Sequence, residues 1–275
     1  MQKIDGHVHF WDYDSGQHSW ITEDMSVLRR NFLPEDIQPL LKSHDIAGCM
    51  LVQVNQTEGE NDYFLKLASG YTFVKGIVGW VDLCAENIVE RLGRYQQSKI
   101  KGFRHILQGD PDRSSMLRPD FKRGIAALRD FGFTYDLLIY PDQLPFASAL
   151  VKSFPRQPFI IDHLAKPEIR KSEVKNWKKE IFNISRMDNV YCKLSGMITE
   201  AHWNSWTKEM FVPYIDAVVE SFGMNRIVFG SDWPVCLLAG SYGEVVSVVE
   251  DYFSVFSKPE QENLFGGNAT TFYGL

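Results

Sequence analysis

Residues 46–52 read Ile-Ala-Gly-Cys-Met-Leu-Val, an apolar run with almost no polar interruption. A strand of this composition is typical of a parallel sheet that helices cover on both faces. Seven other short runs share this character, because they too are rich in β-branched and aromatic residues. The eight predicted strands span residues 3–10, 48–54, 73–81, 100–107, 133–139, 159–164, 190–194 and 226–230.

The segments between these strands carry apolar residues at helical spacing. Pro119 opens one such segment, in which Phe121, Ile125 and Leu128 share a face, and Gly132 marks its end. Similar patterns fill most of the other gaps. Strands that alternate with helices imply parallel strands joined by right-handed crossovers. Eight such units favour a closed (β/α)8 barrel, the TIM barrel, over an open doubly wound sheet.

The length of 275 residues suits one barrel, because about 250 residues are typical of this fold. No linker, low-complexity tract or repeat divides the chain beyond the alternation itself. The sequence therefore predicts an α/β protein with a single domain over residues 1–275. The irregular stretches 11–33 and 109–118 follow predicted strands, so they belong at the C-terminal mouth of the barrel, where barrel enzymes carry their chemistry.

Composition and charge narrow the classes of partner. The chain has 29 Lys and Arg against 35 Asp and Glu, so it lacks the basic excess of a nucleic-acid binder. No apolar run approaches the roughly 18 residues that span a bilayer, and no signal-peptide pattern opens the chain. The cysteines are scattered singly, with no CxxC spacing of a zinc or redox site, and this favours buried reduced thiols. We expect a cytoplasmic protein that binds a small molecule and binds neither nucleic acid nor membrane. The sequence leaves open whether the protein forms a homodimer.

His7 and His9 flank Val8 in the first predicted strand. Residues two apart project from the same side of a strand, so both imidazoles should face the inside of the barrel while Val8 faces the helices. Two imidazoles in a closed core are costly unless they meet a metal, a carboxylate or a substrate. A chance His-x-His pair on a surface strand is the alternative.

Two further motifs end the sixth and eighth predicted strands. If Ile161 faces the helices, Asp162 faces the interior, and His163 turns outward or sits in the loop. Pro234 closely follows Asp232, and because proline cannot donate to a ladder, the strand ends here and the carboxylate lies at the mouth. There Asp232 could act as a general base or a ligand. An aspartate that caps the next helix is the alternative.

Other polar and aromatic residues near the strand ends extend the candidate site. Lys193 stands among apolar residues of the seventh strand and needs a partner if it is buried, either a substrate oxygen or an internal salt bridge. The remaining candidates are Gln53 on the second strand, Arg104 and His105 on the fourth, Asp136 on the fifth, and Trp11 and Trp233 next to the proposed site.

Five motifs stand in order on the predicted strands. They read IDGHVHFWD at 4–12, GFRH at 102–105, DHLAKP at 162–167, KLSG at 193–196 and FGSDWP at 229–234. Together they resemble the amidohydrolase superfamily, and within it the "amidohydrolase 2" lactonase group of L-fuconolactonases, L-rhamnonolactonases and the pyrone dicarboxylate lactonase. The likeness runs to the closing NATTFY at 268–273, and the fourth-strand motif with the DPD at 110–112 favours the sugar-lactonase branch.

The resemblance implies hydrolysis of a sugar lactone, such as L-fuconolactone or L-rhamnonolactone, to the aldonic acid. It implies Asp232 as the general base, with His163 and His105 as further catalytic residues. Fixed cations would polarise the lactone carbonyl, and each would contribute about 3–4 kcal/mol to the stabilisation of the oxyanion. The residues that would bind substrate are Arg104, Lys193, Gln53, Asp136, Trp11 and Trp233.

The resemblance also bears on the metal. By likeness, His7, His9, His163 and Asp232 form the pocket floor or hold a divalent ion, for which zinc is expected. The binuclear members of the superfamily have a fuller ligand set, whereas the seventh strand here carries Lys193 and no histidine at the equivalent position. We therefore expect one divalent ion or none, because a lactone needs less activation than an amide.

Two other functions stay open at this point. One keeps the barrel but makes it a metal-dependent nonoxidative decarboxylase of an aromatic or dicarboxylic acid, which is also an amidohydrolase relative. The other is a barrel that binds sugar acids without converting them. Activity that survives chelation would exclude the decarboxylase, and a large loss of rate on replacing Asp232 would exclude the binder.

Overall fold

Eight parallel strands form one sheet in which each strand pairs with its neighbours in chain order. The computed structural model describes residues 2–275. All eight strands overlap the predicted runs, and the seventh has the predicted bounds. The strands are β1 (Lys3–Val8), β2 (Ile46–Val52), β3 (Val74–Gly79), β4 (Ile100–Ile106), β5 (Thr134–Leu138), β6 (Phe159–Ile161), β7 (Val190–Leu194) and β8 (Ile227–Phe229).

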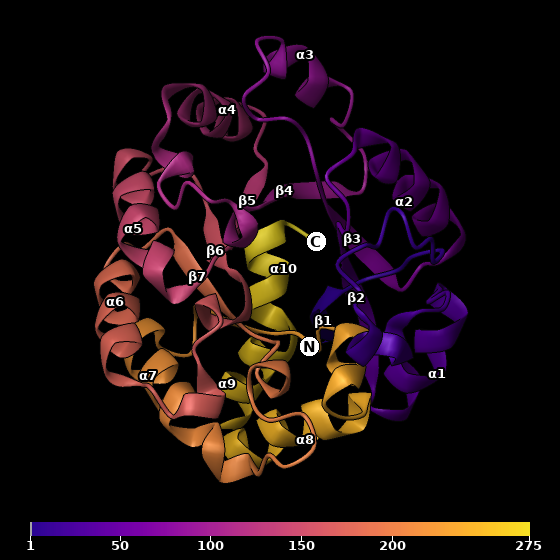
Figure 1. Ribbon diagram of the computed structural model, residues 1–275, viewed down its shortest axis with the longest axis vertical. Helices are drawn as coiled ribbons and strands as arrows, with labels where there is room; N and C mark the ends of the chain where they lie inside the picture. Colours follow the sequence, from indigo (N-terminus) through magenta and orange to yellow (C-terminus); the bar gives the residue numbers. More distant parts are fainter. Residues whose placement is uncertain (1) are drawn as a thin grey trace.

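Helices follow the strands and surround them, as Figure 1 shows. This alternation confirms the TIM barrel that the sequence predicts, with one domain. The helices are α1 (Pro34–Ser43), α2 (Glu58–Gly70), α3 (Ile88–Gly93), α4 (Pro119–Asp130), α5 (Leu144–Ser153), α6 (Lys175–Ser185), α7 (Val212–Phe222), α8 (Tyr242–Phe253), α9 (Lys258–Glu262) and α10 (Asn268–Tyr273).

Several strands end earlier than the sequence predicts. β6 stops at Ile161, because the backbone turns left-handed from His163 onward. Leu164 and Ala165 are nevertheless fully buried. Their apolar character reflects packing at the end of the barrel rather than a longer strand, which is why the pattern alone overestimates the strand.

The seam between β1 and β8 closes the barrel through hydrogen bonds beyond the end of β8. The Asp232 N–H donates to the His7 carbonyl at 2.9 Å, and the His9 N–H donates to the carbonyl of the residue after Asp232 at 2.7 Å. Asp5 adds a side-chain bridge, because one of its oxygens accepts the N–H groups of His7 at 3.1 Å and Ser231 at 2.8 Å. The seam therefore fixes three predicted site residues relative to one another.

A β-bulge in β1 decides which side chains reach the interior. Asp5 pairs with Cys49 of β2, and Val8 pairs with Leu51. Three residue steps on β1 therefore match two on β2, which shifts the inward-facing positions by one. Ile4 lies in the inner core before the bulge and Val8 in the outer core after it, although strict alternation would place both on one face.

Gly6 makes this bulge possible. A Cβ at this position would lie 2.5 Å from Cγ1 of Val228 and 2.7 Å from the Phe229 carbonyl oxygen, closer than such atoms approach. Beyond the bulge, His7 and His9 face the interior, where they meet the other polar groups of the site. This orientation is the one that the sequence predicts.

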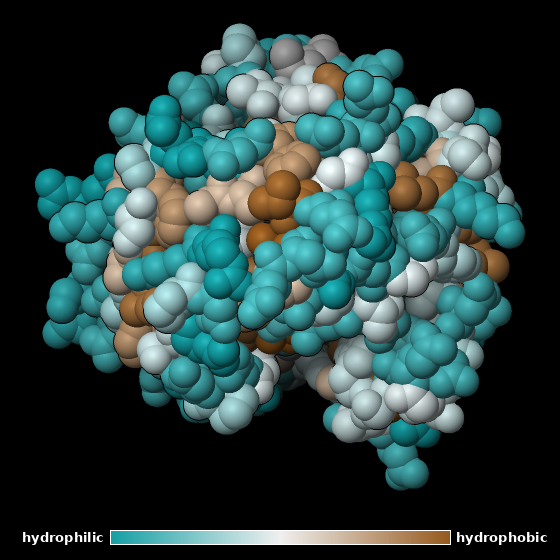
Figure 2. Space-filling view, turned by 90° about the horizontal axis from the view of Figure 1, so that it is seen from above, coloured by the Kyte–Doolittle hydropathy of each residue, from teal (hydrophilic) through white to brown (hydrophobic). Residues whose placement is uncertain are grey.

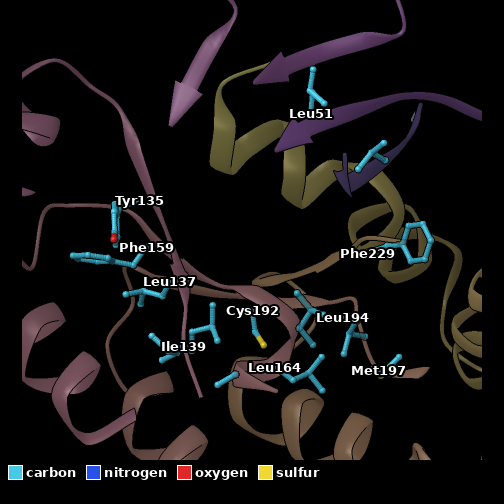
Figure 3. Close-up of a cluster of buried hydrophobic side chains, with 14 of the residues drawn as sticks. Leu51, Tyr135, Leu137, Ile139, Phe159, Leu164, Cys192, Leu194, Met197 and Phe229 are labelled. Carbon is cyan, nitrogen blue, oxygen red and sulfur yellow. The ribbon is translucent and has the colours of Figure 1, made fainter. Parts of the chain in front are cut away.

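Apolar side chains form two cores, one on each side of the barrel wall. The outer core fills the space between strands and helices. Figure 3 shows Tyr135 and Leu137 of β5, Phe159 of β6 and Cys192 of β7 within it. These residues occupy the alternate strand positions that face away from the interior, as the pleat of a strand requires.

The inner core includes the C-terminal helix α10, which lies inside the ring of strands in Figure 1. Phe272 and Tyr273 of α10 pack there against inward-facing residues such as Ile160 and Val228. The Tyr273 hydroxyl also donates to Oδ2 of Asp136 at 2.8 Å. The helix fills one end of the barrel, so the other end is left for a binding site.

On the face seen in Figure 2, hydrophilic side chains predominate and hydrophobic ones gather only in small groups. Within residues 2–275, no helix is both long and apolar enough to cross a bilayer.

Candidate active site

A cavity of about 520 Å³ opens at the C-terminal ends of the strands. Small-molecule sites usually have volumes of roughly 300–1,000 Å³. Strand ends supply the floor, with His9 after β1, Arg104 on β4, His163 after β6 and Asp232 after β8. Loops supply the walls, which include Trp11, Trp20, Lys166, Arg170, Glu200 and Trp203.

Three imidazoles gather around the Asp232 carboxylate. Its Oδ1 lies 3.3 Å from Nε2 of His9, 3.7 Å from Nε2 of His7 and 3.8 Å from Nε2 of His163. Nε2 of His7 and Nε2 of His9 are 3.2 Å apart. His7 is fully buried beneath the floor, while the other three line the cavity. The structure thus brings together the four residues that the sequence analysis places in one site.

These spacings suit a single metal ion. Ligand atoms of a tetrahedral zinc site lie about 3.3 Å apart, given bonds of about 2.0 Å. His7, His9 and Asp232 offer atoms within 4.8 Å of one another. His9 is also oriented for this role, because its Nδ1 lies 2.8 Å from the Val52 carbonyl oxygen, and donation there leaves Nε2 free to bind.

A buried network of charges lies below the floor. Lys193 Nζ is 2.6 Å from Oδ2 of Asp136, 2.9 Å from Oδ1 of Asp162 and 3.1 Å from Nδ1 of His7. Arg104 Nη1 donates to Oδ2 of Asp162 at 2.9 Å. Each cation therefore has a carboxylate partner, which a charge removed from water requires.

Burial and these contacts shift the pKa values of the two acids in the network, Asp136 and Asp162, in opposite directions. Burial raises the pKa of Asp136 to about 6, in spite of the neighbouring Lys193 ammonium. Burial alone would also raise the pKa of Asp162, but Lys193 and His7 outweigh it and hold that pKa well below its usual value. Burial and Lys193 lower the pKa of His7 well below 6.5, so its ring is uncharged at neutral pH.

Asp232 is placed to accept a proton from a water molecule in the cavity. Burial alone would raise its pKa, but the imidazoles, His163 first, outweigh burial and hold that pKa below its usual value. Burial lowers the pKa of His163 to about 4, so its ring is uncharged at neutral pH. Asp232 also has a φ of +58°, a conformation that is uncommon outside glycine and gathers at functional sites. An ionised carboxylate in this setting can act as a general base.

Comparison with known proteins agrees with this geometry. The sequence profile of the amidohydrolase family matches residues 4–275. The chain belongs to the amidohydrolase family. It is 36% identical to the L-fucono-1,5-lactonase of Burkholderia multivorans and 34% identical to that of Burkholderia ambifaria, in each case over 99% of this chain and 96% of the relative. The resemblance to the lactonase group that the sequence motifs suggest is therefore confirmed.

A solved structure is similar over its whole length. It is a crystal structure of an amidohydrolase from Burkholderia multivorans with bound zinc, and it superimposes on this amidohydrolase with a TM-score of 0.96 at 35% identity. The comparison covers 100% of both chains. The two proteins thus share the fold over their whole length.

In this amidohydrolase, His105 does not reach the pocket. The sequence analysis names it a catalytic residue beside Arg104, but neighbours on a strand face opposite sides. His105 Nδ1 accepts a hydrogen bond from Trp80 Nε1 at 3.2 Å, and its ring lies edge-on to Phe121 of α4. His105 therefore faces the helices, and the structure corrects its assignment.

Four of the six predicted substrate-binding residues also lie outside the cavity lining. Gln53, Asp136 and Lys193 are fully buried below it, and Trp233 is 2% exposed with its ring edge-on to Phe32. Gln53, Asp136 and Lys193 have no exposed surface that a substrate could touch. The two that do line the cavity are Arg104 and Trp11.

Gln53 instead holds Arg104 in the floor of the amidohydrolase site. Arg104 Nε and Nη2 donate to Oε1 of Gln53 at 3.1 and 2.8 Å, and Nη2 donates to the Gln53 carbonyl at 2.6 Å. Glu60 of α2 fastens the loop that follows, because its carboxylate accepts the N–H groups of Val54 at 2.9 Å and Asn55 at 3.0 Å. Gln53 and Glu60 thus position Arg104.

Glu60 should make the stability of the protein depend on pH. Burial raises its pKa from 4.5 to about 7. Between these values the folded protein holds a proton that the unfolded chain has lost, so the free energy of unfolding falls as pH rises, by roughly 3 kcal/mol in all. Urea unfolding at about pH 5 and about pH 8 should show a fall that is roughly 2–3 kcal/mol larger in the wild type than in Glu60→Gln, in which Asp136, whose pKa is also raised, still contributes a fall of its own. The same pH slope in both proteins would contradict it.

Several residues of the site escape the sequence analysis. Asp162 is placed in the interior but given no role, although it joins Arg104 to Lys193. Lys166 and Glu200 line the cavity wall, and neither is singled out as functional. The available signal for Lys166 is the DHLAKP motif, in which it stands three residues after His163.

Proposed function

We propose that this amidohydrolase hydrolyses a sugar lactone to the aldonic acid, with L-fucono-1,5-lactone or a closely related lactone as substrate. One observation carries the proposal: the Asp232 carboxylate lies among three imidazoles, with Arg104 in the same floor of a cavity of about 520 Å³. Two relatives that match 99% of the chain are named L-fucono-1,5-lactonase. This likeness supports a lactonase over a decarboxylase of aromatic acids.

In the proposed reaction Asp232 takes a proton from water while the water oxygen attacks the carbonyl carbon of the lactone. Arg104 donates to the carbonyl oxygen as negative charge develops there, and a preorganised donor of this kind contributes about 3–4 kcal/mol. His163 Nδ1 lies 2.9 Å from Oγ of Ser195, a contact that orients its ring toward the reacting group. The ring C–O bond then breaks, and the ring oxygen becomes a hydroxyl of the aldonic acid.

We also propose a single divalent-ion site at the same floor. His7, His9, His163 and Asp232 would hold the ion: Nε2 of His7 and Nε2 of His9 are 3.2 Å apart, and the three imidazole Nε2 atoms lie 3.3 to 3.8 Å from Oδ1 of Asp232. Zinc is the proposed ion, because the similar amidohydrolase from Burkholderia multivorans has bound zinc. Such an ion, when bound, polarises a carbonyl oxygen as a Lewis acid.

We expect at most one zinc ion per chain. A second group of metal-capable residues, His7, Asp162 and His163, shares both histidines with the proposed site. Its carboxylate is already engaged by Arg104 at 2.9 Å and Lys193 at 2.9 Å. Metal analysis after zinc loading and gel filtration should find one equivalent or less. Two tightly held equivalents would contradict this arrangement.

A panel of lactones tests the proposed function. A pH-indicator assay would follow acid release from L-fucono-1,5-lactone, an L-rhamnonolactone and their five- or six-membered counterparts, each with and without a chelator. We expect at least one sugar lactone to open well above its spontaneous rate. Release of carbon dioxide from a dihydroxybenzoate is the matched assay for a decarboxylase, and we expect none. No acceleration with any sugar lactone would reject the proposal.

A further inference from the structure

Four consecutive residues after β6 have a left-handed backbone. The φ angle is +53° at His163, +56° at Leu164, +59° at Ala165 and +50° at Lys166. Residues other than glycine adopt this conformation singly, and each costs about 1–2 kcal/mol. The turn is held by a hydrogen bond of 2.7 Å from the Lys166 N–H to the His163 carbonyl, and by one of 2.7 Å from the Trp177 indole to the Leu164 carbonyl. Strain of this kind gathers at functional sites.

The turn brings the side chains of His163 and Lys166 to the same side. A hydrogen bond between residues three apart gives about three residues per turn, so the first and fourth side chains eclipse. Both line the cavity, whereas Leu164 and Ala165 between them are fully buried. Gly196 leaves room for this arrangement, because a Cβ there would lie 2.7 Å from Nδ1 of His163. The left-handed turn therefore delivers Lys166 to the cavity beside His163.

The Lys166 ammonium has donors that the protein does not use. Within residues 2–275, Lys166 Nζ makes no hydrogen bond, and its one ion pair is with Oε1 of Glu200 at 3.8 Å. The Lys166 side chain is only 20% exposed. An ammonium carries three N–H donors, and all three are left here for acceptors in the cavity. A ligand oxygen in the cavity would supply one.

We propose that Lys166 is a catalytic residue that protonates the ring oxygen as the lactone opens. The proposal rests on the proposed lactonase function. The ring oxygen is bonded to the same carbon that water attacks, so its proton donor must stand beside the group that activates the water. Lys166 stands there, one turn from His163, whose Nε2 is 3.8 Å from Asp232. Glu200, on the same wall, pairs with the ammonium at 3.8 Å.

The step balances without a further reactant. The water oxygen bonds to the carbonyl carbon, its proton passes to Asp232, and the carbonyl π electrons move to oxygen. When these electrons return, the ring C–O bond breaks and its electron pair stays on the ring oxygen, which takes a proton from Lys166. Asp232 returns its proton to Lys166 by way of water, and the new carboxylic acid loses its own proton to solvent.

A comparison of leaving groups tests the proposal. An aldonolactone expels an alkoxide, whereas the aryl lactone dihydrocoumarin expels a phenolate, the anion of an acid with a pKa of about 10, which needs the proton far less. We expect Lys166→Met to lower kcat on the aldonolactone about 100-fold or more, and kcat on dihydrocoumarin less than about 5-fold. Arg170→Met removes another cation from the same wall and should change both rates by one common factor. Equal losses on both substrates in Lys166→Met would overturn the proposal.

Chemical rescue is a second measurement. If the wild type does not hydrolyse dihydrocoumarin, this measurement alone tests the role of Lys166. Added ethylammonium should raise the rate of Lys166→Ala on the aldonolactone in proportion to amine concentration and leave Asp232→Asn unchanged. Absence of rescue in Lys166→Ala would count against Lys166 while the wild type stays active. A wild type that opens no sugar lactone would instead reject the proposed function and, with it, this proposal.

Discussion

Replacing Asp232 with asparagine is expected to lower kcat/KM for the sugar lactone by about 1,000-fold. The amide keeps the size of the side chain but cannot take a proton from water. Its NH2 group would also face Nε2 of His9, which lies 3.3 Å from the present carboxylate oxygen. Initial rates in the pH-indicator assay, over a range of lactone concentrations, measure the effect.

Asp142→Asn is the matched control for this change. Asp142 is exposed, pairs with Arg113 at 2.7 Å and lies outside the cavity lining, so its substitution should leave kcat/KM within about twofold. Retention of more than about a tenth of the wild-type rate in Asp232→Asn would contradict the general-base role. It would also revive the view that the barrel only binds sugar acids.

Lys193→Met should cause the largest loss of stability, about 3–5 kcal/mol in the free energy of unfolding. The ammonium is fully buried and lies 2.6 Å from Asp136 and 2.9 Å from Asp162. Without it, two carboxylates stay in the barrel interior, and only Asp162 keeps a cation, Arg104. Urea unfolding at neutral pH measures the loss.

Two comparisons separate this effect from a general loss of charge. Lys178→Met breaks an exposed pair with Glu220 and should cost less than about 1 kcal/mol. The deficit of Lys193→Met should also shrink in acid, because burial already raises the pKa of Asp136 to about 6 and a protonated Asp136 no longer needs the ammonium. A deficit that is equal at about pH 5 and about pH 8 would argue against charge compensation as its cause.

The architecture follows from the sequence because its signals are local. Runs such as 46–52 are apolar throughout, as expected of a strand that is buried on both faces of its sheet. The orientation of His7 and His9 follows from the two-residue period of a strand. The bulge at Gly6 does not change the orientation of this pair, because both residues lie beyond it. It does reverse the faces of the strand on which Ile4 and Asp5 lie.

Depth within the barrel is not a local property, and there the sequence misleads. Lys193 and Asp136 sit on the inward faces of their strands, as a substrate-binding residue would, yet they lie one layer below the floor. The position of α10 helps to set that depth, because Tyr273 donates to Asp136 from inside the barrel. His105 is different, since the alternation that places Arg104 inward already requires its neighbour to face the helices.

Lys166 shows a further limit. Leu164 and Ala165 readily adopt right-handed or extended conformations, so nothing in their side chains indicates four left-handed residues in a row. The turn is imposed by tertiary contacts, among them the indole of Trp177, thirteen positions from Leu164 in the chain. A motif such as DHLAKP can point to these residues, but only the folded backbone shows that His163 and Lys166 share one side of the cavity.

The most direct test of the account is the opening of L-fucono-1,5-lactone by the wild-type protein in water enriched with oxygen-18. We expect ring opening well above the spontaneous rate, with one heavy oxygen in the product, located in its carboxylate, because water activated by Asp232 attacks the carbonyl carbon. No acceleration, or heavy oxygen on the carbinol carbon, would contradict the account.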